Sequence, residues 1–247
     1  MSNNTGGAIE MQCRLCSQEG EICNSHIIPE FVYKTLYDER HCFTVLSTSP
    51  NPPRQSEQKG LREKLFCRDC EAKLSRYEDY ARRVVVGGTK LIGRETSLGQ
   101  LIEGLDYKLF KLFLLSILFR AGISRHDMFK RVHLGPHEER IRAMLVQEDP
   151  GAQTDYPCLM IGLAGDKKLT QNVIDQPTKF RKDGVTIYRF MYLGFLWVYF
   201  VSSHLKKDFL GDVLLAENGS MTVPIKNFSD LKHIEAFFAE AAEKGLV

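Results

Sequence analysis

The side chains best suited to chemistry in this chain are four cysteines, in two Cys-x-x-Cys pairs, and a histidine between the pairs. Each pair offers two thiolates from one tight turn, and four thiolates are a common ligand set of a closed tetrahedral zinc site. The spacing therefore predicts a structural zinc ion, held by Cys13, Cys16, Cys67 and Cys70. The histidine, His26, lies in a Ser-His-Ile-Ile-Pro segment, where its ring could act as a base or bind a metal.

The other cysteines indicate reduced thiols rather than disulfides. The chain has seven cysteines, an odd number, and no N-terminal stretch that resembles a signal peptide. Cys23 lies near the first pair and could replace one of the four zinc ligands, whereas Cys42 and Cys158 are interpreted as buried thiols. We therefore expect a reduced, cytoplasmic protein. A structural zinc would supply folding energy to a small module and by itself predicts no activity.

The bulk composition is that of an ordinary globular protein. The chain has 247 residues, 43% of them hydrophobic, and a formal net charge of +2. That charge gives no global basic field, so any contact with nucleic acid would come from local patches. The longest apolar run, residues 190–201, is shorter than the ~20 residues of a membrane helix and is rich in aromatic and β-branched residues. We expect buried strands there and no membrane partner.

The elements that must position the cysteines follow from local patterns. Pro29 predicts the start of a short helix over residues 30–37, and the prolines and Gly60 predict a loop over residues 47–60. A helix is predicted from Glu71 to residue 86, because Leu74, Tyr77 and Ala81 recur at helical spacing, and Gly87 ends it.

The remainder predicts an α+β fold. Helices are expected over residues 106–121 and 136–146, then strands at 158–163, 184–190, 194–201 and 213–215, and a capped C-terminal helix over 228–242. We expect a zinc-binding module over residues 9–88 and an α+β domain over residues 89–247, to which the sequence assigns no role. The second domain would contain the helical segment and a small antiparallel sheet closed by the C-terminal helix.

The order Cys-x-x-Cys, His-Ile-Ile-Pro, then Leu-Phe-Cys-x-x-Cys opening a helix resembles the zinc-bearing branch of the HNH, or ββα-metal, endonuclease superfamily. The resemblance covers roughly residues 10–85 and implies a β-hairpin pinned to a helix by the zinc. The chain is also similar to a divergent group of bacterial proteins that share Ser-His-Ile-Ile-Pro, Gln-x-Gly before the second cysteine pair, Cys-x-x-Cys-Glu and Ser-x-Tyr-Glu.

The resemblance implies roles for individual residues. His26 matches the general base, and Ser25 stands where the family usually has a metal-binding Asp or His. Glu71 stands where a helix histidine or asparagine usually lies, and it could hold Mg²⁺ or Mn²⁺, with Glu78 as a second ligand. Arg62 or Arg68 could steady the phosphate. The family's asparagine before the second cysteine pair is missing from residues 60–66.

Each of these residues also has a structural interpretation. His26 could hydrogen-bond a backbone carbonyl or ligate zinc, and Ser25 could cap the helix after Pro29 or bind a backbone group. Glu71 could favour the helix dipole, and Glu78 could form an i, i+4 pair with Arg82 on the surface.

Two groups of basic residues could contact phosphates or form solvated faces. The first group lies between residues 54 and 83 and consists of Arg54, Lys59, Arg62, Lys64, Arg68, Lys73, Arg76, Arg82 and Arg83. The second consists of Arg125, His126, Lys130, Arg131, His133 and His137.

Three functions remain open from the sequence. The first is a metal-dependent endonuclease that cleaves DNA phosphodiester bonds. The second is a catalytically inactive, zinc-stabilised module that binds nucleic acid or protein. The third is a subunit of a bacterial defence assembly, in which the C-terminal two-thirds docks a partner protein.

Overall fold

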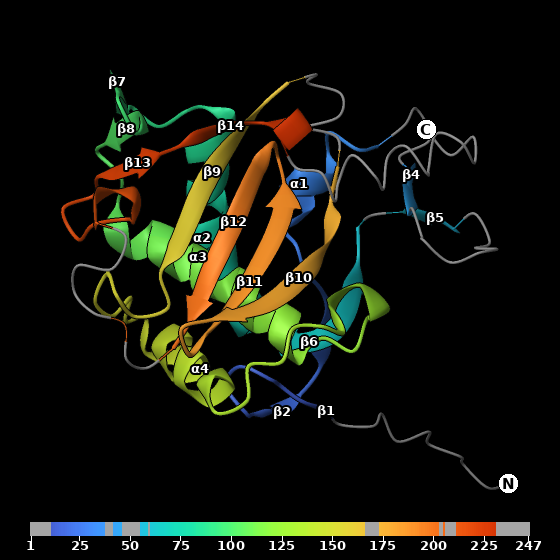
Figure 1. The fold of residues 1–247 in the computed structure, drawn as a ribbon. Helices are drawn as coiled ribbons and strands as arrows, with labels where there is room; N and C mark the ends of the chain where they lie inside the picture. The colour runs from blue at the N-terminus through green and yellow to red at the C-terminus, as the bar shows by residue number, and fades with distance from the viewer. Residues whose placement is uncertain are drawn as a thin grey trace, which may run out of the picture.

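The computed structural model describes residues 11–37, 42–45, 55–58, 60–165, 173–202, 205 and 211–230, with the backbone alone for 42–45 and 55–58. Within these residues the fold is α+β, with four α-helices and five small sheets. Helices α2 and α3 lie behind a five-stranded sheet, and the paired strands of the N-terminal third lie at the side and bottom of the view in Figure 1. The predicted fold class is therefore confirmed at the level of α+β.

The N-terminal third is built on two antiparallel strands and the helix that follows them. Strand β3 (Ile22–His26) pairs with β6 (Arg62–Cys67), and α2 (Arg68–Val86) begins at the next residue. The ladder opposes Ile22 to Cys67 at one end and His26 to Arg62 at the other. Between them lie α1 (Glu30–Tyr33) and the pair β4 (Cys42–Val45) and β5 (Gln55–Gln58).

A short pair of strands precedes this unit. Strand β1 (Met11–Gln12) pairs with β2 (Glu19–Gly20), and the turn between them carries the first two cysteines. Helix α2 buries one face through Leu74, Tyr77 and Ala81, as its spacing predicts, and Gly87 ends it with φ of +104°. The helix starts three residues before the predicted Glu71, at Arg68.

The centre of the molecule is helix α3 (Tyr107–Ile123). Asp106 caps its N-terminus by accepting a hydrogen bond from the Leu109 amide at 2.9 Å. The helix is buried on nearly all sides, as its apolar sequence predicts, because α2 packs on one side and the five-stranded sheet on another. Helix α4 (His137–Gln147) packs against it, and the 3₁₀ turn η1 (Asp127–Phe129) joins the two.

The five-stranded sheet has the order β10-β11-β12-β9-β14. Its strands are β9 (Cys158–Ala164), β10 (Asp175–Lys182), β11 (Val185–Tyr192), β12 (Phe195–Val201) and β14 (Ile225–Asn227). All neighbours are antiparallel except β14, which runs parallel to β9. Trp197 on β12 is fully buried, which confirms the prediction of a core strand.

A three-stranded sheet, β13-β8-β7, consists of β7 (Ile92–Thr96), β8 (Gly99–Glu103) and β13 (Met221–Val223). These strands and β10 were not predicted. All five residues of β7 are exposed, and β10 is an edge strand of mostly polar residues, so neither shows the apolar alternation on which strand prediction depends. Pro177 in β10 lies where the register shifts, which is a usual place for proline in a sheet.

Three sequence predictions need correction. The predicted strand at 213–215 is instead the 3₁₀ turn η2 (Gly211–Val213) followed by an isolated bridge from Leu214 to Leu159, because three apolar residues are too few to define a period. Part of the predicted loop at 47–60 is strand β5. Helix α1 ends at Tyr33, before the predicted residue 37. Of the predicted C-terminal helix, η3 (Phe228–Asp230) is described and the rest lies outside the described residues.

One continuous cluster of buried side chains crosses the predicted boundary between residues 88 and 89. It runs from Cys13 to Val223 and includes residues of β3, α2, α3 and the five-stranded sheet. Polar contacts cross the same boundary, since Lys73 Nζ donates to the carbonyl of Val146 at 2.9 Å and Arg76 pairs with Glu148 at 2.9 Å.

A buried lysine lies within this core. Lys111, on α3, is 2% exposed, and its Nζ donates to the Tyr156 carbonyl at 3.4 Å. Burial lowers the pKa of Lys111 to about 8, against the opposing effects of Cys158 and Asp155. A lysine charged at neutral pH in this position costs stability, because water solvated it in the unfolded chain.

We predict that Lys111→Met stabilises the protein at pH 7. The fall in the pKa of Lys111 from 10.5 to about 8 corresponds to roughly 3 kcal/mol, at about 1.4 kcal/mol for each pH unit. Between pH 8 and 10.5 the unfolded state binds more protons at this lysine, so its penalty disappears as the pH rises. Urea unfolding of both proteins should show that the difference in their free energies of unfolding is smaller at pH 10 than at pH 7. A difference that is constant with pH would contradict the burial argument.

Candidate metal centre and the His26 site

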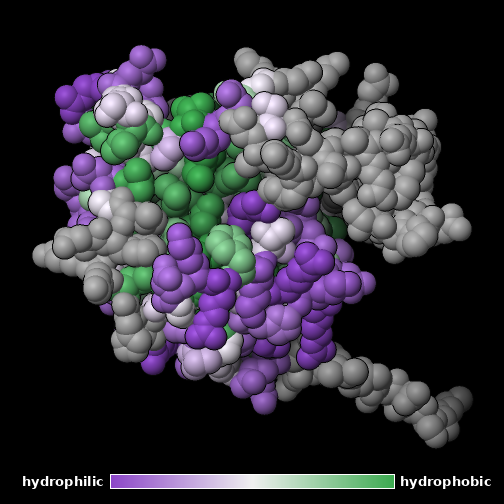
Figure 2. Space-filling model, in the orientation of Figure 1, coloured by the Kyte–Doolittle hydropathy of each residue, from purple (hydrophilic) through white to green (hydrophobic). Residues whose placement is uncertain are grey.

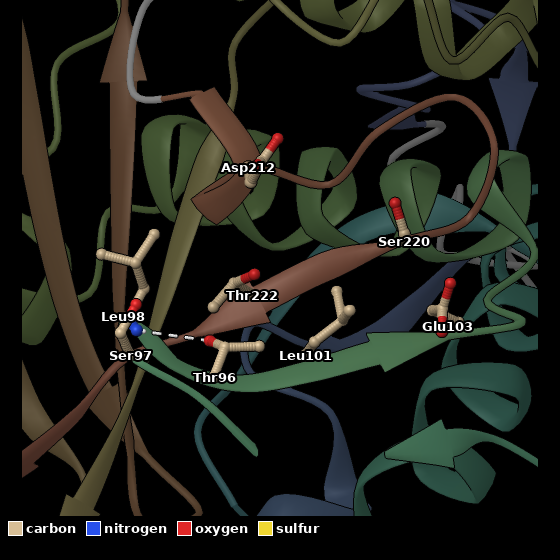
Figure 3. A pocket seen from close by; sticks show the side chains of 8 residues that line it. All are labelled: Thr96, Ser97, Leu98, Leu101, Glu103, Asp212, Ser220 and Thr222. Atoms are coloured by element: carbon tan, nitrogen blue, oxygen red, sulfur yellow. Dashed lines mark hydrogen bonds between the residues drawn. The ribbon is translucent and has the colours of Figure 1, made fainter. Parts of the chain in front are cut away.

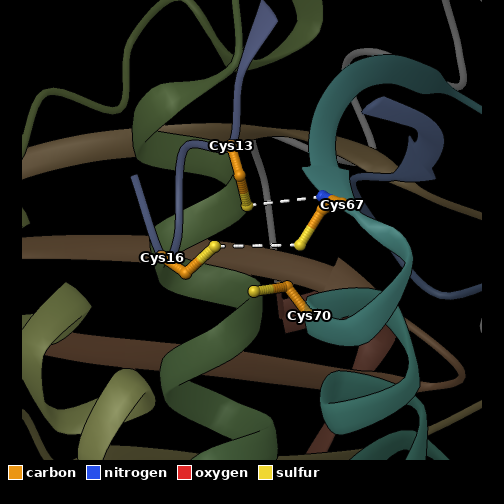
Figure 4. A group of neighbouring side chains, drawn as sticks. All are labelled: Cys13, Cys16, Cys67 and Cys70. Atoms are coloured by element: carbon orange, nitrogen blue, oxygen red, sulfur yellow. Dashed lines mark hydrogen bonds between the residues drawn. The ribbon is translucent and has the colours of Figure 1, made fainter. Parts of the chain in front are cut away.

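The four cysteines of the two Cys-x-x-Cys pairs converge on one point. Their Sγ atoms all lie within 4.8 Å of one another, and Cys16 Sγ is 3.7 Å from Cys67 Sγ. A tetrahedron with ~2.3 Å zinc–sulfur bonds has sulfur atoms about 3.8 Å apart. The cluster can therefore hold a metal ion such as zinc, and Figure 4 shows the side chains pointing inward from two separate segments, Cys13 and Cys16 from one and Cys67 and Cys70 from the other.

Local backbone geometry aims each cysteine at this point. Cys13 and Cys16 are carried by the turn between β1 and β2, where Ser17 takes a left-handed φ of +63°. Cys67 is both the last residue of β6 and the N-cap of α2, and Cys70 lies in the first turn of that helix. The Cys67 amide donates to Cys13 Sγ at 3.3 Å. Such N–H donors stabilise a thiolate.

The protonation of Cys13 agrees with a thiolate ligand. Burial alone would raise its pKa. Hydrogen bonds from the backbone N–H groups of Cys16, Cys67 and Leu15 outweigh this effect and lower the pKa to about 7. Metal binding requires deprotonated thiols, so these N–H groups favour the form of Cys13 that binds a metal.

Among the described residues, these four are the only group of three or more Cys, His, Asp or Glu side chains placed to hold a metal. Cys23 is not part of the group, so it does not replace a predicted ligand. Cys158 is a buried free thiol, as predicted, and burial raises its pKa. The side chain of Cys42 lies outside the described residues.

His26 lies at the end of the β3–β6 ladder far from the cysteines. Its ring nitrogen Nε2 accepts a hydrogen bond from Arg62 Nε at 3.0 Å, and the two residues are cross-strand partners. Because a guanidinium can only donate, Nε2 is unprotonated in this arrangement. The structure thus places two of the predicted catalytic residues side by side, with a lone pair of the histidine directed at the arginine.

Gly60 and Tyr33 hold the His26 ring from behind. Gly60 has a φ of +72°, and a Cβ there would lie 2.7 Å from the Tyr33 ring and 3.1 Å from His26 Cδ2. Tyr33 is fully buried, which raises the pKa of its hydroxyl. Only glycine allows the backbone to pass this close to both rings, so the Gln-x-Gly motif has a packing reason.

Ser25 faces the opposite side of β3, toward α2. It is 1% exposed, its Oγ accepts from the Phe66 amide at 3.3 Å, and its hydroxyl hydrogen-bonds the Glu71 carboxylate. The interpretation of Ser25 as a residue that binds a backbone group is confirmed, and Pro29 instead occupies the N-cap position of α1.

Glu71 lies mostly out of water. Burial raises its pKa, Ser25 and Arg120 lower it, and Glu78 raises it again. Its Oε1 is buried and, within the described part of the chain, has no hydrogen-bond partner. A buried carboxylate oxygen without a donor costs free energy, and the attraction of the Arg120 charge offsets part of that cost.

Glu78 makes an ion pair that the sequence did not predict. Its Oε1 pairs with Nη2 of Arg120, on α3, in a short contact. Arg82, its expected i, i+4 partner, instead lies 4.0 Å from Asp79. Arg120 is 1% exposed and also donates from Nη1 to the His26 carbonyl at 2.8 Å and from Nη2 to Ser116 Oγ at 3.3 Å.

Several basic residues of the first group are bonded to other groups of the same chain, although Lys64 and Arg76 remain exposed. Lys73 and Arg76 bind Glu148, and Lys64 donates to the Ile22 carbonyl at 2.8 Å. Arg68, Arg82 and Arg83 are exposed, and the side chains of Arg54 and Lys59 lie outside the described residues.

In the second group, three histidines make local contacts. His126 Nδ1 accepts from the Met128 amide, His133 meets Tyr188 through its backbone, and His137 Nδ1 lies 3.0 Å from the Tyr156 hydroxyl. Arg125, Lys130 and Arg131 are exposed.

The contacts between the hairpin and α3 were missed from the sequence. Glu63 accepts from Ser124 Oγ at 2.8 Å and from the Arg125 amide at 2.9 Å, which fixes the end of α3 to β6. The sequence did contain a signal. Ser116 and Arg120 lie one turn apart in a mostly apolar helix, and buried polar side chains require hydrogen-bond partners. The sequence does not identify the carboxylate with which the arginine pairs.

A surface hollow lies beside the three-stranded sheet (Figure 3). Its lining is Thr96, Ser97, Leu98, Leu101, Glu103, Asp212, Ser220 and Thr222. Glu103 pairs with Arg94 at 2.5 Å, and Asp212 is the other carboxylate of the lining.

No family model, curated protein or solved structure matches this chain. Among the described residues, no helix is both long and apolar enough to span a membrane.

We predict that Cys70→Ser abolishes metal binding, whereas Cys23→Ser leaves it intact. The serine removes one of four thiolates, while Cys23 lies outside the cluster. Since metal binding in such sites supplies on the order of 10 kcal/mol, Cys70→Ser should also lose cooperative unfolding. Zinc content after gel filtration and thermal unfolding measure the two effects. Equal zinc in both variants would rule out the assigned ligand set.

We predict that Gly60→Ala is more destabilising than Gly184→Ala. Both glycines have positive φ, +72° and +80°, so both substitutions add left-handed strain of about 1–2 kcal/mol. Only at Gly60 would the new methyl overlap side chains, whereas at Gly184 nothing lies within 4 Å. The excess loss in urea unfolding reports crowding of Tyr33 and His26. An equal loss at both positions would contradict the close approach.

Proposed function

We propose that this chain is a zinc-stabilised, HNH-like endonuclease that cleaves DNA phosphodiester bonds, with His26 as general base and Arg62 as the phosphate ligand. The observation that carries the proposal is the 3.0 Å contact of His26 Nε2 with Arg62 Nε at the end of two antiparallel strands that lead into a helix. The four-cysteine cluster at the other end of the same ladder agrees with the zinc-bearing branch of that superfamily.

The arrangement supports a simple mechanism. An incoming phosphate is a better acceptor for the Arg62 guanidinium than a neutral imidazole, because the phosphate is an anion and the contact becomes an ion pair. Arg62 then moves from His26 to the phosphate and frees the Nε2 lone pair. His26 takes a proton from water as the water oxygen attacks phosphorus, the opposite P–O bond breaks, and the leaving oxygen takes a proton from solvent.

The surroundings of the site bear on substrate binding. Arg68 on α2 is exposed, and Arg125 is exposed beside β6, where its backbone amide is held by Glu63. Arg125 supports an approach of a polyanion across the His26 end of the hairpin, whereas Arg68 lies at the cysteine end and could contact a phosphate further along the same chain. These residues set register on a phosphate backbone and carry no sequence information.

A second function is favoured by a different observation. The Ser25 hydroxyl, at the position of the family's usual metal ligand, is engaged by the Phe66 amide and by Glu71. A site that has lost this ligand could bind nucleic acid or a partner protein without cleaving anything. In that version the zinc keeps the hairpin in shape, and the chain would act as a recognition subunit, for example in a bacterial defence assembly.

The decisive experiment is nicking of supercoiled plasmid by the zinc-loaded protein, beside His26→Ala and the control Asn24→Ala. Asn24 is exposed on the same strand, so its loss should leave the backbone of β3 unchanged. We expect nicking by wild type and Asn24→Ala and a loss of about 10²-fold or more in His26→Ala, the typical contribution of a general base.

The control measurements separate the two functions. All three proteins should contain equal zinc and unfold at similar temperature. If none of them nicks DNA but all bind it with a steep salt dependence, the non-cleaving module replaces the endonuclease. Equal nicking by wild type and His26→Ala would assign the activity to a contaminant or to another residue.

A further inference from the structure

Two partly buried carboxylates on α2 and one buried guanidinium on α3 form a charge cluster next to the backbone of His26. Glu71 and Glu78 are seven residues apart, two turns along the same helix face, and the charge of Glu78 raises the pKa of Glu71. Arg120 acts on Glu71 across space and pairs directly with Glu78. This is the position where the resemblance to the HNH superfamily implies a divalent ion.

The guanidinium makes the contacts that an ion there would make. It binds a Glu78 oxygen, the carbonyl of His26 and the hydroxyl of Ser116, all of them hard oxygen atoms. Oxygen ligands of this kind are those that Mg²⁺ and Mn²⁺ take. The charge also agrees, because a single buried cation between two carboxylates offsets much of their repulsion.

We propose that Arg120 is the resident cation of this carboxylate pair, that it occupies the position of the predicted divalent ion, and that the His26 site works without such an ion. A second cation next to a buried guanidinium would be repelled at short range in a medium that screens poorly. The last part rests on the proposed endonuclease, whereas the identity of the cation is testable without any activity.

The position of Arg120 also defines what it does. At 1% exposure it reaches neither solvent nor a substrate on the outer side of β3, so it does not replace a metal at the scissile phosphate. Its hydrogen bond to the His26 carbonyl instead fixes the backbone that carries the base, at 2.8 Å. Arg120 is therefore a positioning residue, and charge stabilisation at the phosphate falls to Arg62.

The test is rescue of an arginine-deleted variant by Mn²⁺. Arg120→Ala leaves two partly buried carboxylates without a cation and opens space for an ion and its waters. We expect 1 mM MnCl₂, with zinc already bound, to raise the melting temperature of Arg120→Ala by several degrees and that of wild type not at all. Manganese EPR should show about one bound ion per chain in the variant and none in wild type.

Two matched variants control the assignment. Lys111→Ala also removes a buried cation from α3, but Lys111 donates to a backbone carbonyl rather than to a carboxylate, so Mn²⁺ should not rescue this variant. Arg120→Ala combined with Glu78→Gln removes a ligand of the proposed ion and should lose the rescue. If Arg120→Ala is unfolded, return of cooperative unfolding on adding Mn²⁺ supports the proposal, and no return overturns it.

Other outcomes are equally decisive. One Mn²⁺ bound per wild-type chain and lost in Glu71→Gln would overturn the proposal, because the divalent site would then exist beside Arg120. If wild type nicks plasmid, the rate should be unchanged by enough EDTA to remove free divalent ions while zinc content stays constant, and loss of nicking would overturn the ion-free site. Absence of nicking in every condition would remove the endonuclease but leave the Mn²⁺ result on Arg120 standing.

Discussion

The convergence of four cysteine sulfurs is the constraint on which the N-terminal third depends. It closes a long excursion of the chain at one point, and closure of a long loop carries an entropy cost that an internal contact must repay. The 3.7 Å between Cys16 and Cys67 brings the turn after β1 onto the junction of β6 and α2. Because Cys67 ends a strand and begins a helix, one residue sets the strand ladder, the helix start and the metal geometry together.

The second organising element is α3, a helix without a continuous polar face toward water. Most of its residues are buried, and its buried polar side chains form hydrogen bonds with groups inside the molecule. Arg120 reaches the hairpin and α2, Ser124 reaches Glu63, and Lys111 reaches the Tyr156 carbonyl. Such buried polar groups add little net stability, but each is expensive to leave unpaired, so they specify how the helix sits. The position of His26 is thus determined by a helix almost a hundred residues later in the chain.

The sequence predicted what local patterns encode. The cysteine spacing predicted the cluster. Helical spacing predicted α2, an apolar run predicted α3 and a first-turn proline predicted α4, each to within a few residues, and further apolar runs predicted β9, β11 and β12. The polar strand β10 and the exposed β7 were missed because their residues are held by pairing rather than by burial. The pairing of Glu78 with Arg120 was missed for another reason, since helical spacing offered Arg82 as a partner and sequence alone cannot rank a local cation against a distant buried one.

His26 and Arg62 are cross-strand neighbours, and the Ile27 amide still bonds the Leu61 carbonyl at 3.1 Å just beyond them. The chain therefore leaves the ladder at Ile27 and returns to it at Leu61, and this backbone hydrogen bond joins the two ends of the segment between them. Helix α1 in this segment is anchored in the core by Phe31, Val32 and Tyr33, but between α1 and Gly60 the chain can change in length without moving the ladder or the cysteine sulfurs. Proteins with this fold could change what they recognise by exchanging the segment between α1 and Gly60, while the strand pairing that joins its ends stays the same.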